Sequence, residues 1–306
     1  MSSYEAKTSA VLDDGLGPLV PVGRPKGLIE GTKAALREIV GHRELLRRLV
    51  VKDVKSRYHD SYLGVFWSLL RPIIQLAVYY FFIGKVLGAA HSVPAFAVFV
   101  FGNLTIWTLF TETVGSGTSS ILSNAGLVKK VYLPREIFPL TALGGALFTF
   151  LIQFVILIIA TALFGVFPWH LELLYVIPAV LIMSIWGLAL GMALGAINTY
   201  LRDTEHLVAI ALMLFFWASP ILYSLRFVHQ AMGGTVLEWL YLANPATIAL
   251  IAMQRAVWTS GVADPAQYWP TDLGWRVAIA LVTGVVLLWV SQRIFARLQG
   301  NFAQEL

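Results

Sequence analysis

Six long apolar stretches constrain the fold of this chain more than any other feature of the sequence. They lie at about residues 63–88, 95–122, 138–167, 173–198, 207–225 and 273–295. Each is long enough to cross a hydrocarbon core of about 30 Å at about 1.5 Å of helix rise per residue. Charged residues make up only 13% of the chain, about half the share in a soluble domain. The sequence therefore predicts an all-α polytopic membrane protein with six transmembrane helices and excludes an ordinary cytosolic enzyme.

The distribution of Lys and Arg predicts how these helices are oriented. With the N-terminus inside, only Lys85, Arg226, Arg255 and Arg276 of the 22 Lys and Arg residues would lie outside, and Arg71 would lie within the first span. Cytoplasmic sides of membrane proteins collect Lys and Arg. We therefore expect both termini in the cytoplasm and the chain in the plasma membrane, the inner membrane of a bacterium. The same rule explains the net charge of +5 without a nucleic acid partner.

The segment before the first span combines a polar arm with an amphipathic helix. The arm carries scattered Gly and Pro, which is typical of a flexible cytoplasmic segment. In the helix, Leu46, Val50 and Val54 share one stripe and charged residues gather opposite, as in a helix that lies on the membrane surface. A solvated helix packed on a soluble partner is the alternative. The expected arm, interfacial helix, transmembrane domain and cytoplasmic tail are residues 1–35, 36–61, 62–298 and 299–306.

A further segment, residues 236–257, is largely apolar. It also contains polar residues such as Gln254, which make another membrane crossing there unfavourable. Asn244 and Pro245 suit the cap and the first turn of a helix. We therefore expect re-entrant outer helices between spans five and six, with one helix over residues 246–257 that enters the outer leaflet and returns.

Several kinds of chemistry have no sequence signature here. No G-x-x-x-x-G-K-[ST] motif occurs, and the one Gly-Lys pair, Gly84 and Lys85, lacks the upstream Gly, so the chain does not bind ATP through a P-loop. The sequence has no Cys, and its six His residues are dispersed. We therefore expect no metal site. Asp203 and Glu205 lie in a short polar connection, where a solvated turn is the simplest interpretation.

Motifs in the polar connections resemble a known family. The most specific are Tyr-Leu-Gly-x-x-Trp-x-x-x-x-Pro at residues 62–72 and Leu-Pro-Arg-Glu at residues 133–136, and YLANPATIALIAMQRAV follows at residues 241–257. Their order resembles the permease subunits of ABC transporters that export lipid-linked polysaccharides, namely O-antigen, teichoic acid and galactan. The resemblance covers about residues 38–298.

This resemblance implies a transport subunit, not an enzyme. Two copies would form a homodimer around the conduit, and two separate ATPase subunits would bind beneath and hold ATP and Mg, so that this chain itself binds no cofactor. The substrate would be a polysaccharide attached through pyrophosphate to a polyprenyl lipid. It would move from the cytoplasm across the plasma membrane.

The resemblance also implies contacts with the ATPase and an outer gate. Residues 127–138 would form a coupling helix with exposed side chains, and residues 200–205 a smaller contact. The candidate coupling residues are Lys129, Lys130, Tyr132, Pro134, Arg135, Glu136, Arg202, Asp203 and Glu205. Residues 225–257 would form the outer gate, and its candidate residues are Asn244, Pro245 and Gln254.

A path for sugars should be polar or lined by aromatic rings, because unpaired hydroxyl groups are costly in hydrocarbon. The aromatic candidates, each of which could instead face lipid or the core, are Tyr79, Tyr80, Trp107, Trp186, Phe216, Trp217 and Tyr223. Arg71 and Glu112 fall at similar depths, about 12 Å and about 15 Å from the inner boundary by helix rise. We expect them to face each other as an ion pair or to line the inner mouth of the conduit. Alternatively, Arg71 snorkels to the surface or Glu112 is protonated.

Two other functions remain open. An ATP-independent lipid-linked glycan flippase or secondary transporter usually has more spans and buried ionisable residues for ion coupling. A membrane-embedded glycosyltransferase generally carries an acidic motif in its first outer loop, and residues 88–95 contain no acid. Dependence on a separate ATPase distinguishes both from the exporter.

Overall fold

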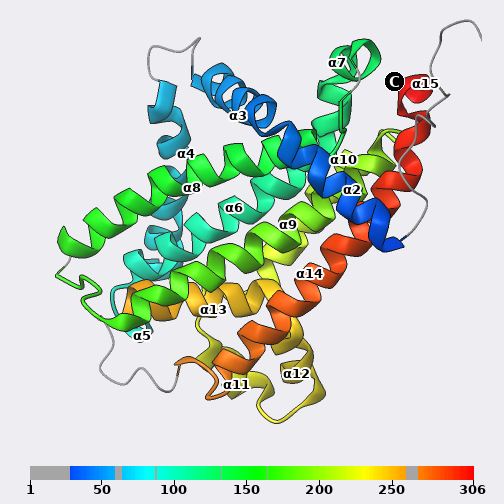
Figure 1. Ribbon diagram of the computed structural model, residues 1–306. Coiled ribbons are helices and arrows are strands. Elements are labelled where there is room, and N and C mark those ends of the chain that lie inside the picture. The colour runs from blue at the N-terminus through cyan, green and yellow to red at the C-terminus, as the bar shows by residue number, and fades with distance from the viewer. Residues whose placement is uncertain (1–27, 59–63, 87, 132, 164, 260–267) are drawn as a thin grey trace, which may run out of the picture.

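A computed structural model describes residues 28–58, 64–86, 88–131, 133–163, 165–259 and 268–306 (Figure 1). Throughout these ranges the regular structure is helical and no strand occurs. The predicted all-α class is therefore confirmed.

Four long apolar helices form the centre of the molecule. They are α6 (Phe96–Ser123), α8 (Ile137–Leu163), α9 (Val176–Asn198) and α14 (Leu273–Leu298) (Figure 1). Helix α6 contacts both α8 and α9, and α9 contacts α14 on its other side. The apolar window of α6 is 78% buried, against 39% or less in the other three. Helix α6 is therefore the central element, although its sequence is the least apolar of the four.

The expectation of six spans is not confirmed. Within the described ranges four helices are long and apolar enough to cross a membrane, or five if a bent helix pair counts as one span. The first predicted span is α4 (Gly64–Tyr79) followed by the π-helix η1 (Tyr80–Val86). The fifth is α10 (Thr204–Trp217), whose 14 residues rise only about 21 Å. Helix α10 is short because the chain turns after Trp217 instead of continuing to residue 225.

Glycines bring α6 and α9 into close contact. Gly187, Gly191 and Gly195 recur every fourth residue on α9 and therefore share one face. A Cβ atom on Gly191 would lie 3.0 Å from the carbonyl oxygen of Thr113 and 3.2 Å from the Cα of Gly117 on α6. Small residues at such positions let membrane helices approach until their backbones touch.

The segment before the first span forms two helices instead of one. They are α2 (Leu28–Gly41) and α3 (Arg43–Tyr58), which cross one end of the bundle (Figure 1). The break follows Gly41, a residue with low helix propensity. Helix α2 contacts α14, and Ala35 is buried. Residues 28–35 are thus helical and packed, which corrects their assignment to a flexible arm.

The opposite end of the bundle carries the short helices α5 (Ala89–Ser92), η2 (Leu171–Tyr175), α11 (Leu225–Met232), α12 (Val236–Ala243) and α13 (Pro245–Trp258). The predicted start of α13 is confirmed, since Asn244 Oδ1 accepts a hydrogen bond of 2.9 Å from the backbone N–H of Ala246 and Pro245 opens the helix. Helices α12 and α13 meet at 76°. Nearly every side chain of α13 is buried against the protein, and the return of this pair to the outer surface stays a prediction.

Three short helices lie at the same end of the bundle as α2 and α3. They are α7 (Ala125–Lys130), η5 (Gln299–Asn301) and α15 (Phe302–Glu305) (Figure 1). Helix α15 contacts α7, and Phe302 is fully buried. The expected tail, residues 299–306, is therefore packed on the connection between the second and third predicted spans.

Candidate functional site

Helix α3 rests on a pair of glycines in α8. A Cβ atom at Gly144 would lie 2.6 Å from Val50 Cγ2, and one at Gly145 would lie 2.6 Å from Asp53 Oδ2. The same atom at Gly145 would lie 3.1 Å from Arg57 Nη2. The absence of side chains at these two positions therefore brings both charged groups of α3 against the surface of α8.

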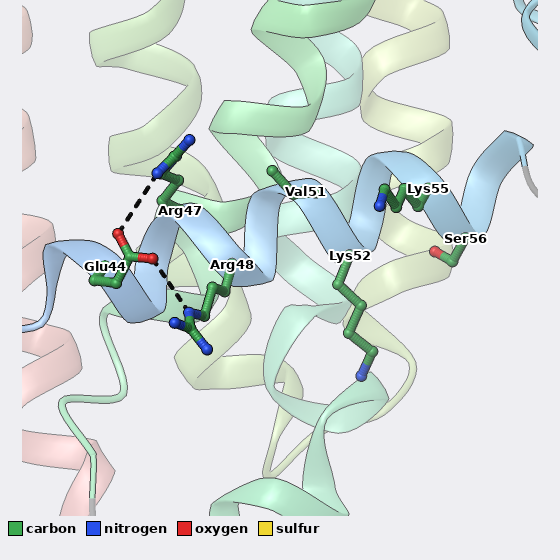
Figure 2. A pocket seen from close by; sticks show the side chains of 7 residues that line it. All are labelled: Glu44, Arg47, Arg48, Val51, Lys52, Lys55 and Ser56. Carbon is green, nitrogen blue, oxygen red and sulfur yellow. Dashed lines mark hydrogen bonds and ion pairs between the residues drawn. The ribbon is translucent and has the colours of Figure 1, made fainter.

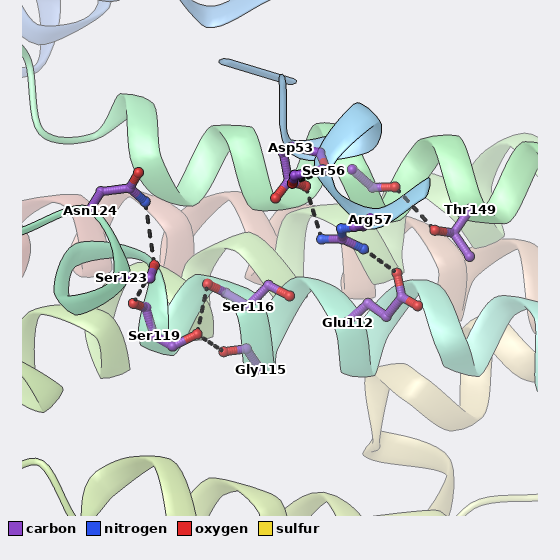
Figure 3. Close-up of polar contacts among 11 residues, drawn as sticks. Asp53, Ser56, Arg57, Glu112, Gly115, Ser116, Ser119, Ser123, Asn124 and Thr149 are labelled. Carbon is purple, nitrogen blue, oxygen red and sulfur yellow. Dashed lines mark hydrogen bonds and ion pairs between the residues drawn. The ribbon is translucent and has the colours of Figure 1, made fainter. Parts of the chain in front are cut away.

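Arg57 connects α3 to the central helix. Its guanidinium group pairs with Asp53 at 3.0 Å, one helical turn earlier, and with Glu112 of α6 at 3.4 Å (Figure 3). The three side chains are between 29% and 34% exposed, so solvent screens the pair only in part. Two carboxylates share one guanidinium group at this point.

The ion pair of Glu112 with Arg57 was not foreseen from the sequence. The side chain of Arg71 on α4 lies outside the described residues, so its expected contact with Glu112 stays a prediction. Helix rise gives a depth only for charges within the predicted spans. Arg57 belongs to the surface helix α3. It reaches Glu112 because Gly145 has no side chain that would hold α3 away from α8, and no local sequence pattern reveals this contact.

A row of small and hydroxyl residues continues from Glu112 along α6 towards α7. Glu112, Ser116, Ser119 and Ser123, here called the polar stripe, are partly or fully exposed and lie on one face. Ser123 Oγ donates to the Ser119 carbonyl at 3.0 Å, and Ser119 Oγ donates to the Gly115 carbonyl at 3.3 Å (Figure 3). These hydroxyl groups bond back to carbonyl groups of their own helix. The stripe therefore presents a polar surface along α6.

The outer face of α3 is strongly basic. Arg47, Arg48, Lys52 and Lys55 line an open hollow of about 650 Å³, together with one acid, Glu44 (Figure 2). Glu44 pairs with Arg48 at 3.2 Å and Arg47 at 3.8 Å. The face retains a net positive charge, which suits an anionic lipid headgroup or a phosphate group.

Four of the aromatic candidates form one cluster. The ring of Phe216 lies 6.0 Å from the ring of Tyr79, 6.0 Å from the ring of Trp107 and 5.6 Å from the ring of Trp217. Trp107 is almost completely buried, whereas Trp217 is exposed. The structure thus brings together aromatic rings from α4, α6 and α10, although lining of a conduit stays a prediction.

The other three aromatic candidates have different surroundings. Trp186 donates its indole N–H to the Ala280 carbonyl at 2.9 Å and so fastens α9 to α14. Tyr223 donates to the Trp217 carbonyl at 2.9 Å in the turn after α10. Tyr80 lies at the surface, 5.8 Å beneath the ammonium group of Lys85.

The candidate coupling residues are partly exposed and partly buried. Lys129 and Lys130 are exposed at the end of α7. The expected exposure of Pro134 and Glu136 is wrong, since both are buried. Glu136 immediately precedes α8, where its carboxylate accepts a hydrogen bond of 3.4 Å from Gln292 of α14. Tyr132, another candidate, lies outside the described residues.

The second connection is exposed on the same side of the molecule. Arg202, Asp203 and Glu205 precede or begin α10 and all three are exposed. The side chain of Asp203 makes no capping hydrogen bond to α10. Solvated side chains at this position agree with the expectation of a polar turn.

At the opposite end Gln254 fixes the turn that follows α10. It is buried and donates to Pro220 O at 2.8 Å and to Asn103 Oδ1 at 3.2 Å. Asn103 in turn donates to Ile221 O at 3.0 Å. Because the turn supplies no helical donors for these carbonyls, amide side chains from α6 and α13 satisfy them. Gln254 is therefore an anchor between three elements.

A second contact at this end was missed in the sequence. Arg255 pairs with Glu172 of η2 at 2.7 Å, and its guanidinium group lies 4.5 Å from the ring centroid of Tyr175. The partners are more than eighty residues apart in the chain, so no local pattern reveals them. The contact fastens the buried helix α13 to η2.

Comparison with known proteins identifies the family. Residues 44–258 match the model of the ABC-2 type transporter family. The chain belongs to the ABC-2 type transporter family. It is 30% identical over 272 residues to the O-antigen export system permease protein RfbA of Myxococcus xanthus. This match covers 89% of this chain and 98% of that protein. It is 27% identical over 264 residues to the O-antigen export system permease protein RfbA of Klebsiella pneumoniae. This match covers 86% of this chain and 95% of that protein.

The part of this ABC-2 transporter that matches the family model extends from α3 through α13. It includes the Arg57–Glu112 pair, the polar stripe, both polar connections and the outer helices. Helix α14 and the C-terminal segment lie beyond it. The family assignment expected from the motifs is confirmed.

Reversing Arg57 or Glu112 should lower the thermal stability of the purified transporter. Arg57→Glu places three carboxylates together, and Glu112→Arg places two guanidinium groups together. Combining the two substitutions restores opposite charges and should recover about 1 kcal/mol or less, because the pair is partly solvated. Thermal unfolding of the four proteins measures this. The exposed Glu44–Arg48 pair is the matched control, and an equal recovery there would contradict a special role for Arg57.

Proposed function

We propose that this chain is the permease subunit of an ATP-driven exporter that moves a polyprenyl-pyrophosphate-linked polysaccharide across the plasma membrane. The polymer would be of the O-antigen type, or a related teichoic acid or galactan. The family assignment supports an ABC transporter, and the names of the relatives support polysaccharide export. The structural observation that carries the proposal is the polar stripe on α6, because its side chains stay partly or fully exposed although α6 is the most buried of the four long helices.

The arrangement of the charges supports a pyrophosphate carrier. The basic face of α3 lies at the end of the bundle where the ion pair and the polar stripe begin. A pyrophosphate headgroup would meet Arg47, Arg48, Lys52 and Lys55 there, and the attached sugars would then meet the hydroxyl groups of α6. Aromatic rings can stack on sugar faces without holding one sugar tightly, which suits the cluster around Phe216 farther along the path.

We propose further that two copies of the chain form the conduit and that two ATPase subunits bind beneath them. The ATPase subunits would hold ATP and Mg. The exposed ends of α7 and α10 would contact them, with both termini in the cytoplasm of a bacterial cell. Helices α11, α12 and α13 would then form the outer gate. The buried bonds of Gln254 and the half-buried ion pair of Arg255 support a gate that is held to α6 and η2 in this conformation.

Co-expression with candidate ATPase subunits tests this function. The chain should co-purify with one ATPase in a complex of two copies of each. Cells that carry a hydrolysis-deficient ATPase should accumulate lipid-linked polysaccharide inside and display none outside. Export that persists without any ATPase would favour the flippase, and sugar transfer by the isolated chain would favour the glycosyltransferase. Either result would contradict the proposal.

A further inference from the structure

The C-terminal segment turns back onto the bundle after α14. Tyr200 donates its hydroxyl group to the Leu298 carbonyl at 2.8 Å, where α14 ends. The chain then passes through η5 into α15, and the fully buried Phe302 opens this last helix. We call residues 299–306 the C-terminal hook. Its contacts involve the second polar connection through Tyr200.

Phe302 lies at the centre of a small apolar cluster. Its ring packs edge-on against Phe295 at 5.5 Å and against Tyr200 at 6.2 Å between ring centroids. The same cluster contains Val128 of α7, and Leu127 and Leu306 pack against it. This cluster is separate from the main core of the bundle. Phe302 therefore touches Tyr200 of the second polar connection and Phe295 near the end of α14. It shares its cluster with Val128 of the first polar connection.

The first connection also contacts Phe302 through a charged residue. The guanidinium carbon of Arg135 lies 5.7 Å from the centroid of the Phe302 ring. A guanidinium group over an aromatic face is attracted by the ring quadrupole. Arg135 is thus oriented by the hook, whereas Lys129 and Lys130 remain exposed beside it. Burial, followed by the charge of Glu305, raises the pKa of the Tyr200 hydroxyl group.

We infer that Phe302 is a positioning residue that holds the two polar connections in one fixed arrangement for the ATPase. The inference rests on the proposed function, because it assigns to the hook a task in ATPase binding. The connections lie about seventy residues apart in the chain, and each is short. A rigid apolar contact between them fixes their spacing, so that one ATPase surface can bind both without a further ordering cost.

The test compares ATPase binding and thermal stability in purified, full-length variants. Phe302→Ala should weaken binding of the ATPase subunit by at least about fivefold, a typical coupling between sites. Phe302→Leu refills the cluster and should restore most of the binding. Phe99→Ala is the control. Phe99 is also buried, but it lies near the start of α6, at the opposite end of the bundle from the hook. This variant should lower the unfolding temperature without changing ATPase affinity.

Tyr200→Phe provides a milder second variant if Phe302→Ala does not accumulate. It removes only the hydrogen bond to Leu298 and should weaken ATPase binding while the protein unfolds cooperatively. Affinity that is unchanged in both variants would overturn the inference. If Phe99→Ala weakens ATPase binding as much as Phe302→Ala does at the same loss of unfolding temperature, the effect is one of general stability and the inference is also overturned. If the unaltered chain binds no ATPase, the proposed function fails instead, so the two failures are distinguishable.

Discussion

Replacing Lys129 and Lys130 by Glu should abolish polysaccharide export while the transporter stays folded in the membrane. Both side chains are exposed at the end of α7, so their reversal disturbs no packing. Like charges at a protein interface cost several kcal/mol, and each 1.4 kcal/mol is about tenfold in affinity. We therefore expect a loss of ATPase binding and of export of at least about tenfold. Export of surface polysaccharide and co-purification of the ATPase measure the two effects.

Arg226→Glu is the matched control for this change. Arg226 is exposed on α11 at the opposite end of the bundle, where no ATPase would bind. It should leave ATPase co-purification unchanged. Reversing Arg135 is a poorer test, because its guanidinium group lies over Phe302 and its loss would also disturb the C-terminal hook. Normal export by the double Lys variant would contradict the assignment of α7 to ATPase coupling.

Gly191→Leu should prevent the transporter from folding. The new side chain would collide with the Thr113 carbonyl and the Gly117 backbone of α6, neither of which can rotate away. Overpacking costs about 1–3 kcal/mol when side chains absorb it, and more when two helices must separate. The free energy of unfolding of a native protein is only about 5–15 kcal/mol in total. The expected result is little monodisperse protein after extraction in detergent.

Gly115→Leu is the matched control because it makes the same change in α6 itself. Among the described residues, no atom beyond the local backbone of α6 lies within 4 Å of a Cβ placed at Gly115, so this variant should elute as a folded, monodisperse protein. Equal yields from the two variants would show that the α6–α9 contact is not as close as the structure describes.

The helices of the bundle were predictable where hydrophobicity alone determines them. Long apolar stretches give α6, α8, α9 and α14, and the Asn-Pro pair gives the start of α13. The C-terminal end of α10 was not predictable, because it depends on tertiary contacts such as the bond of Gln254 to the turn after α10.

The candidate site was predictable as a set of residues but not as a set of contacts. The polarity of Glu112 identified it, yet its partner Arg57 reaches it only because Gly145 admits α3. The Leu-Pro-Arg-Glu motif was found as a pattern, but Glu136 is buried where it accepts a hydrogen bond from Gln292 of α14. The hook had no signature, since a short and mostly polar tail with only Phe302 and Leu306 as large apolar residues does not reveal its packing partners in sequence.

Transport in a reconstituted system tests the central claim most directly. The complex of this chain with its ATPase would be placed in vesicles with the ATPase side outward, and a defined polyprenyl-pyrophosphate-linked glycan added to the outer leaflet. The account predicts that the glycan becomes protected inside the vesicles with ATP and Mg, and not with ADP or with the Lys129→Glu, Lys130→Glu variant. Protection that is equally fast without ATP would contradict it.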